Sequence, residues 1–112
     1  MLTRDQLSEI SKPRERLMHV PLLNESIKIK LFRKGDLDAM RAESLVAGEV
    51  DNSKLERLLV LRGLIEPALT DADYEELAQG NAAVYYAMVN AIMEGNGLTA
   101  LAQRDARRTF PA

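Results

Sequence analysis

The chain has 112 residues, of which 46% are hydrophobic, with no cysteine, one histidine and a formal net charge of −2 at pH 7. This length is typical of one domain that buries its own core. The lack of cysteine excludes disulfides and thiolate chemistry, and a single histidine argues against a histidine-based metal site. No apolar run approaches the roughly 20 residues that a membrane span needs, and the first residues lack a signal-peptide pattern. We therefore expect a soluble intracellular protein with no cofactor, metal or membrane partner.

Charge is distributed unevenly along the chain. Residues 1–35 contain eight Lys or Arg and four Asp or Glu, residues 36–98 contain four and twelve, and residues 99–112 contain three and one, which gives +4, −8 and +2. An ordinary solvated surface is the simplest interpretation. Basic ends and an acidic middle would also favour head-to-tail self-association of copies of the chain.

The first residues predict a short helix. Thr3 and Gln6 have the spacing of a capping box, so we expect a helix over Arg4–Ile10. The helix should end before Pro13, because the residue that precedes a proline is disfavoured in the helical conformation.

A β-hairpin is expected next, at about residues 15–33. Apolar residues alternate with polar ones, which is typical of strands buried on one face. The residues expected on the buried face are Met18, Val20, Ile27, Ile29 and Leu31. Leu17 and His19 should then lie on the other face, with a turn at Leu22–Ser26. Pro21 cannot donate a ladder hydrogen bond, so its strand should be an edge strand or end there.

Residues from about 36 to 109 are expected to form a helical block, which start and stop signals divide into separate helices. The expected helices are Gly35–Ala47 (with Leu45 on its apolar face), Lys54–Ile65, Asp71–Ala78, Ala82–Met93 and Ala100–Arg108. The signals at their junctions are Gly48, Asp51, Pro67, Thr70 with Asp73, Asn81, and Gly95–Gly97. The predicted fold is α+β and mainly α: one domain over residues 1–112, with an N-terminal β-hairpin packed on a bundle of about five short helices.

Sequence features that would support catalysis are few. His19 has no obvious partner to orient it, as a catalytic base requires. The acidic residues after Thr70 fit the first turns of a helix better than a calcium loop. Gly95–Gly97 lacks the Lys and the preceding strand of a phosphate-binding loop. An enzyme is therefore the least favoured class of function.

A small nucleic-acid-binding regulator is the alternative that the basic residues support. Lysines alternate along the second hairpin strand, and arginines recur near the C-terminus, where they would neutralise phosphates. The residues concerned are Lys28, Lys30, Arg33, Lys34, Arg104, Arg107 and Arg108. A solvated strand face explains the hairpin residues equally well, because lysines at a sheet edge also discourage unwanted strand pairing.

The segment Ala82–Met93 is the most apolar helix of the chain, with Asn90 as its only polar residue. Two interpretations remain open: a central core helix covered by the others, or an interface helix, since Tyr and Met are enriched at binding surfaces. Both hold if one face is core and the other is contact. The candidate partner-binding residues are Tyr85, Val89, Ile92, Met93, Leu64 and Tyr74.

The order of these segments resembles the tail assembly chaperones of long-tailed bacteriophages and prophages. The similar features are the opening MLTRDQL, the strand pair HVPLLNESIKIKLFR, and a glycine-started helix containing Asp-Ala-Met. They continue with a leucine-rich helix leading into Ile65–Leu69, the helix start Thr70–Asp73, and a long helix that ends in Gly97–Thr99. The chain departs from the pattern at Lys34, where such proteins often have a threonine cap, and at the C-terminal ARRTFPA.

The resemblance implies a non-catalytic role in the host bacterial cytoplasm. Proteins of this family bind the tape measure protein, keep it soluble and help to recruit tail tube subunits, and they are thought to be absent from the mature virion. A tape measure protein is long, helical and partly apolar. A chaperone for it needs an apolar surface of loose selectivity, and many weak contacts along one partner add up to stable binding.

Overall fold

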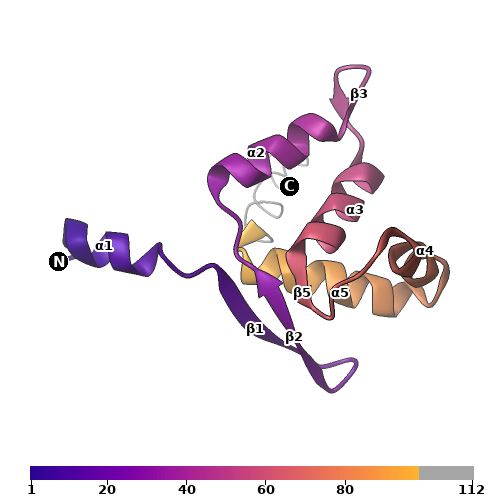
Figure 1. Cartoon of the computed structure of the whole chain (residues 1–112), viewed down its shortest axis with the longest axis horizontal. Helices are drawn as coiled ribbons and strands as arrows, with labels where there is room; N and C mark the ends of the chain where they lie inside the picture. The colour runs from indigo at the N-terminus through magenta and orange to yellow at the C-terminus, as the bar shows by residue number, and fades with distance from the viewer. Residues whose placement is uncertain (99–112) are drawn as a thin grey trace, which may run out of the picture.

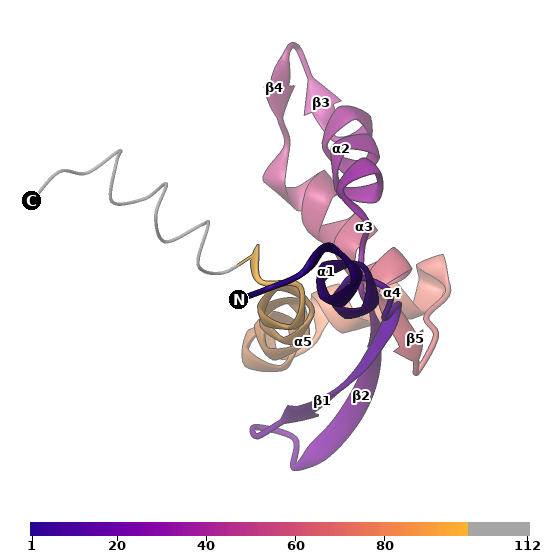
Figure 2. The same ribbon diagram turned by 90° about the vertical axis from the view of Figure 1, so that its left-hand side faces the viewer.

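The computed structural model describes residues 1–98, which form five helices and two small sheets (Figures 1 and 2). In chain order the elements are α1 (Arg4–Ile10), β1 (Glu15–Val20), β2 (Glu25–Lys30), α2 (Lys34–Glu43), β3 (Leu45–Val46), β4 (Glu49–Val50), α3 (Asn52–Gly63), β5 (Leu64–Glu66), α4 (Asp71–Gln79) and α5 (Ala82–Gly95). This confirms the α+β, mainly α class. Within the described residues, no helix is both long enough and apolar enough to cross a membrane.

The hairpin has the expected two faces. β1 and β2 pair antiparallel from Glu15 opposite Lys30 to Val20 opposite Glu25. Val20, Ile27 and Ile29 are buried, whereas Leu17 and His19 on the other face are exposed, as the alternation predicted. β1 ends directly before Pro21 and forms the edge of the sheet, whose strand order is β1-β2-β5.

The third strand of this sheet corrects one sequence expectation. The predicted helix Lys54–Ile65 begins earlier, after Asp51, and ends at Gly63; Leu64–Glu66 then leaves in extended conformation as β5. β5 pairs antiparallel with β2, so it satisfies the backbone groups on the inner edge of the hairpin. Local signals extended the helix to Pro67 because they contain no information about the unpaired edge of β2.

The second helix is also shorter than predicted. α2 ends at Glu43, and the next residues form a two-residue hairpin of β3 and β4 around Ala47 (φ 53°) and Gly48 (φ 83°). Two positive φ values are typical of the tight turns that join antiparallel strands. Leu45, expected on the apolar face of a helix, is therefore exposed in β3.

The predicted helix junctions are otherwise confirmed. The side chains of Asp51, Thr70 and Asn81 cap α3, α4 and α5 respectively. Gly97, with φ of 71°, follows the C-terminal cap of α5. The predicted helix Ala100–Arg108, with its arginines, lies outside the described residues.

Helix α5 lies at the centre of the molecule and packs against β1, β2, α3 and α4 (Figure 1). Its C-terminal turn comes so close to the sheet that a Cβ atom on Gly95 would lie 2.2 Å from Ile29 Cδ1. Gly63 of α3 is similarly close to Ile92, at 2.8 Å from Ile92 Cγ2. Glycine is therefore required at both positions by packing rather than by backbone conformation.

Candidate interaction surface

The partner-binding residues suggested by the sequence lie mainly in the core. Five of them form part of one buried cluster, and the most accessible, Tyr85, is 9% exposed. These five are Leu64, Tyr74, Tyr85, Val89 and Ile92. Met93 is the sixth and is half-buried against the same cluster. The fold thus brings these residues together in its core. The five buried side chains are not accessible to a partner while the chain is folded.

The exposed apolar side chains lie elsewhere. Large hydrophobic residues that remain at least 45% exposed are Met1, Leu2, Leu7, Ile10, Leu17, Leu22, Leu45, Val46 and Tyr86. Four of these nine belong to the first ten residues of the chain. This segment, residues 1–14, which contains α1 and leads into β1, is called the N-terminal arm below.

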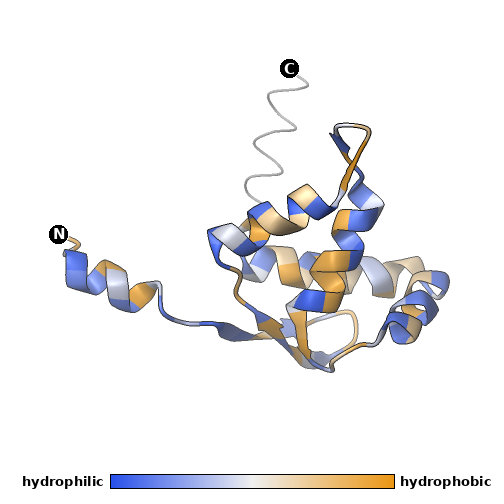
Figure 3. Cartoon of the chain, turned by 45° about the horizontal axis from the view of Figure 1, so that its top comes forward, coloured by the Kyte–Doolittle hydropathy of each residue, from blue (hydrophilic) through white to orange (hydrophobic). Residues whose placement is uncertain are grey.

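The N-terminal arm projects from the body of the molecule (Figure 1), and α1 contains no buried residue. The N-terminus of α1 is capped by a complete capping box between Thr3 and Gln6. Leu2 and Leu7 occupy the positions of a hydrophobic staple, immediately before the cap and at the fourth helical residue. Leu7 and Ile10 are three residues apart and so lie on one face of the helix. Figure 3 shows the mixture of hydrophobic and hydrophilic residues along α1.

A helix of seven residues has little stability in isolation. Helices shorter than about 12–15 residues are marginal in water, because nucleation costs more than the few hydrogen bonds return. The capping box offsets part of that cost, and burial of the exposed leucines and Ile10 against another protein would offset the rest. The arm therefore has the properties of a segment whose helix becomes stable on docking.

A second surface feature is a hollow of about 450 Å³ beside α3, α4 and α5, which holds a tyrosine network. The hydroxyl groups of Tyr74 and Tyr85 are 2.8 Å apart, and Tyr85 donates to Glu56 Oε1 at 3.0 Å. The ring of Tyr85 makes edge contacts with the rings of Tyr74 and Tyr86. These contacts join the three helices to one another.

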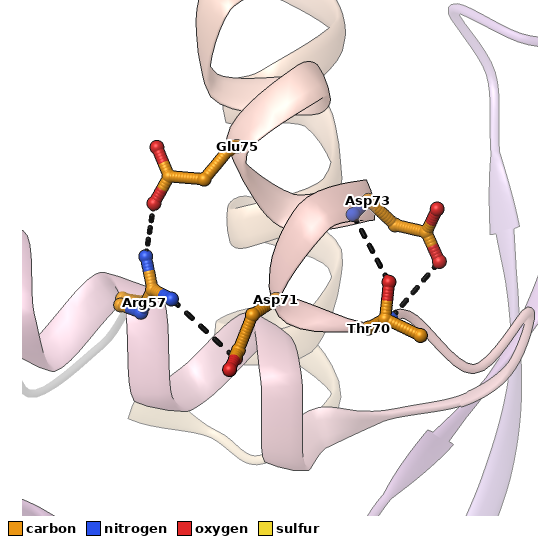
Figure 4. A network of polar contacts seen from close by, with 5 residues as sticks. All are labelled: Arg57, Thr70, Asp71, Asp73 and Glu75. Carbon is orange, nitrogen blue, oxygen red and sulfur yellow. Dashed lines mark hydrogen bonds and ion pairs between the residues drawn. The ribbon is translucent and has the colours of Figure 1, made fainter.

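Arg57 links α3 to α4 from the rim of this hollow (Figure 4). Its guanidinium group hydrogen-bonds the carboxylate of Glu75 and lies 3.4 Å from Asp71 Oδ1. It also lies over the ring of Tyr74, 5.0 Å from the centroid, a cation–π arrangement. The acidic residues near the start of α4 are thereby paired with a cation as well as with the helix dipole.

The chemistry of the hollow fits a structural role. Burial raises the pKa of Tyr85, and its hydrogen bonds with Tyr74 and Glu56 act in the same direction. Tyr85 therefore stays protonated and serves as a hydrogen-bond donor, not as a nucleophile or base. Every buried side-chain N or O atom in residues 1–98 has a hydrogen-bond partner, so the described part of the hollow contains no orphaned group aimed at a ligand.

The capping box of α4 has a measurable pH signature (Figure 4). Asp73 Oδ2 accepts the backbone N–H of Thr70 at 2.9 Å, and Thr70 Oγ1 accepts the N–H of Asp73 at 3.1 Å. Hydrogen bonding to the carboxylate, first by the backbone N–H of Thr70 and then by its hydroxyl group, lowers the pKa of Asp73. Its carboxylate thus stabilises the fold above the unfolded pKa of about 3.9, and this contribution is lost as the pH falls through the folded pKa.

We expect a carbon-detected NMR titration to give Asp73 a pKa below that of the same residue in the urea-unfolded chain. Thr70→Val removes the hydroxyl group and should move the pKa of Asp73 upward. A pKa of Asp73 that is the same in both variants would contradict this description of the cap.

The basic residues of the hairpin and of the start of α2 are partly paired with carboxylates. Lys28 Nζ lies 3.8 Å from Glu15 and 3.7 Å from Glu66, and Lys34 Nζ lies 2.8 Å from Asp38. Those candidate nucleic-acid-binding residues that the structure describes therefore lie among carboxylates and do not form a continuous cationic patch. This weakens the electrostatic argument for nucleic-acid binding.

The exposed arm was visible in the sequence only indirectly. Leu7 and Ile10 lie in the helix expected over Arg4–Ile10, but the capping pattern does not show that this helix lacks a packing partner. The signal was the isolation of Arg4–Ile10, which is separated by Pro13 from every other apolar segment.

Within residues 1–98, no three His, Cys, Asp or Glu side chains are placed to hold a metal ion. Comparisons with known protein families, with curated proteins and with solved structures gave no match to this chain.

Proposed function

We propose that the chain is a non-catalytic tail assembly chaperone of a bacteriophage or prophage. It binds the tape measure protein in the host cytoplasm, helps to recruit tail tube subunits, and leaves before the virion is complete. The observation that carries the proposal is the N-terminal arm, an exposed amphipathic helix with no buried residue. The order of segments that resembles this family, from the opening MLTRDQL to Gly97–Thr99, supports the same conclusion.

The arm suits an extended apolar helical partner. Leu2, Leu7 and Ile10 offer a short apolar face that fits between the side chains of a second helix. Each contact is small and binds weakly, since ordering the arm costs free energy. Many copies along one long partner make the whole complex stable while each copy remains replaceable. This combination is what a factor that must leave the growing tail requires.

Aspartate at two positions of the arm tests the proposal. We expect Leu7→Asp with Ile10→Asp to abolish co-purification of a co-expressed tape measure protein and to return that protein to the insoluble fraction. The fold should be retained, because neither side chain is buried. Leu22→Asp is the matched control: Leu22 is 59% exposed in the hairpin turn, so it carries the same change outside the arm.

The fold of each variant is checked by far-UV circular dichroism and urea unfolding. Loss of solubilisation in both variants would show that the effect is not specific to the arm, and unchanged solubilisation in both would contradict the assigned role of the arm. Failure of the unmodified chain to retain or solubilise the tape measure protein encoded beside it would contradict the chaperone function itself.

A further inference from the structure

The outer edge of β1 carries backbone groups that no described residue satisfies. The N–H of Leu31 donates to the carbonyl of Arg14 at 2.8 Å, which fixes which residues of β1 face β2. In an antiparallel ladder, hydrogen-bonded and non-hydrogen-bonded pairs alternate. Arg16, Met18 and Val20 therefore bond to β2. The backbone N–H and C=O groups of the intervening residues, Glu15, Leu17 and His19, point away from the sheet.

This edge has few of the features that block strand pairing. Pro13 and Pro21 lie outside β1, so the strand between them keeps all its N–H donors. β1 contains no lysine and no bulge, and its register with β2 is regular from end to end. Leu17 lies at the middle of the free edge and is 68% exposed. A second strand placed here would extend the three-stranded sheet and cover that side chain.

We propose that the edge of β1 pairs antiparallel with β1 of a second copy of this chain, with Leu17 opposite Leu17 on the two-fold axis. This register matches the outward groups of both strands, since each directly opposed pair exchanges two backbone hydrogen bonds. It places Glu15 opposite His19 of the second copy, and the reverse. A carboxylate then faces an imidazole that can donate to it, and the two exposed leucines pack together.

The other face of the strand fits the same register. Arg16 lies opposite Met18 of the second copy, so no cation faces another cation across the new pair. A shift by one residue would place outward backbone groups opposite groups already bonded to β2, which removes the hydrogen bonds. The resulting contact is isologous and closes at two copies, unlike the head-to-tail association that the charge pattern suggested. The inference does not depend on the proposed chaperone function.

Single cysteines test the register directly, because the natural sequence has none. In the proposed pair the Cα atoms of the two Leu17 residues are about 5.5 Å apart, within the range of a disulfide. We expect Leu17→Cys to form a covalent dimer rapidly under mild oxidation at micromolar concentration. His19→Cys is the matched control: its two copies are offset by four residues, about 14 Å at 3.4 Å per residue, and should remain uncrosslinked.

A complementary pair of cysteine variants tests the same register with two different positions. An equimolar mixture of Glu15→Cys and His19→Cys should form the mixed disulfide at least tenfold faster than either variant forms its own. Equal rates for Leu17→Cys and His19→Cys, with no preference in the mixture, would show random collision of exposed thiols and would overturn the proposal.

Sedimentation velocity of the full chain gives an independent measurement. The natural chain should show a concentration-dependent monomer–dimer equilibrium, and Leu17→Pro should be monomeric at least tenfold above the midpoint concentration. Proline removes only an N–H that points away from β2, so circular dichroism should show an intact fold. Leu17→Ala keeps that N–H and should weaken the dimer without abolishing it. A chain that is monomeric at every concentration would overturn the proposal. The same holds if the edge of β1 binds a tape measure segment instead of a second copy.

Discussion

Replacing Ile92 with aspartate should abolish the cooperative fold of the chain. Ile92 is fully buried in the C-terminal half of α5, and its Cγ2 atom lies against Gly63 of α3. An unpaired carboxylate at this position loses its hydration and gains no partner, which costs several kcal/mol. Domains of this size have about 5–15 kcal/mol of stability in total. Far-UV circular dichroism and urea titration should therefore show an unfolded or barely folded chain.

A graded series makes this result specific. Ile92→Ala removes apolar atoms without adding charge and should lower the free energy of unfolding by about 2–5 kcal/mol. Asn90→Asp introduces the same charge two residues away on the same helix, at an exposed position, and should leave stability almost unchanged. A folded Ile92→Asp variant that loses its partner would instead identify α5 as a contact helix and not as the core.

Adding one methyl group to Gly95 should destabilise the chain although alanine favours helices. The Cβ atom of Gly95→Ala would lie 2.2 Å from Ile29 Cδ1 and 3.2 Å from Met18 Sδ. Ile29 is fully buried in a close-packed core, so either its side chain must leave its present rotamer or α5 must shift away from the sheet. We expect a loss of about 1–3 kcal/mol in urea unfolding, typical of overpacking.

Two controls separate close packing from helix propensity. Gly35→Ala in α2 meets no atom within 4 Å and should raise stability by up to about 1 kcal/mol, because only the propensity term acts there. Ile29→Val removes the methyl group that Gly95→Ala would strike. In a double-mutant cycle the two changes together should therefore cost less than the sum of the single changes. Strict additivity would show that the cost of Gly95→Ala arises elsewhere.

The local signals of the sequence predicted helix ends and strand faces well. Thr3, Thr70 and Asn81 cap the helices that they were expected to cap, and Gly97 adopts the left-handed conformation after α5. Hydrogen bonds between residues two or three positions apart decide these features, so the nearby sequence contains all the information needed. The alternation in β1 and β2 separated the buried Val20 from the exposed Leu17 for the same reason.

The errors concern residues whose structure depends on distant partners. Leu64 continues an apolar helical pattern, yet it belongs to β5 because β2, more than thirty residues earlier, needs a partner strand. For the six candidate contact residues the sequence left core and interface both open, because apolar character is the same in either place. Only packing distinguished the five buried ones from Leu7 and Ile10, whose exposure arises because α1 packs on no other described element closely enough to bury a residue.

By itself, the sequence determined the helix caps, the two-faced hairpin and the mainly helical class, because these follow from periodicity and from hydrogen bonds between near neighbours. Tertiary structure alone decided which apolar side chains are covered. Burial is a property of pairs of surfaces, and α5 is covered by β1, β2, α3 and α4, which lie far apart in the sequence (Figure 1). Tertiary structure leaves the N-terminal arm and the outer edge of β1 exposed, and these are the two surfaces that we propose bind another protein chain.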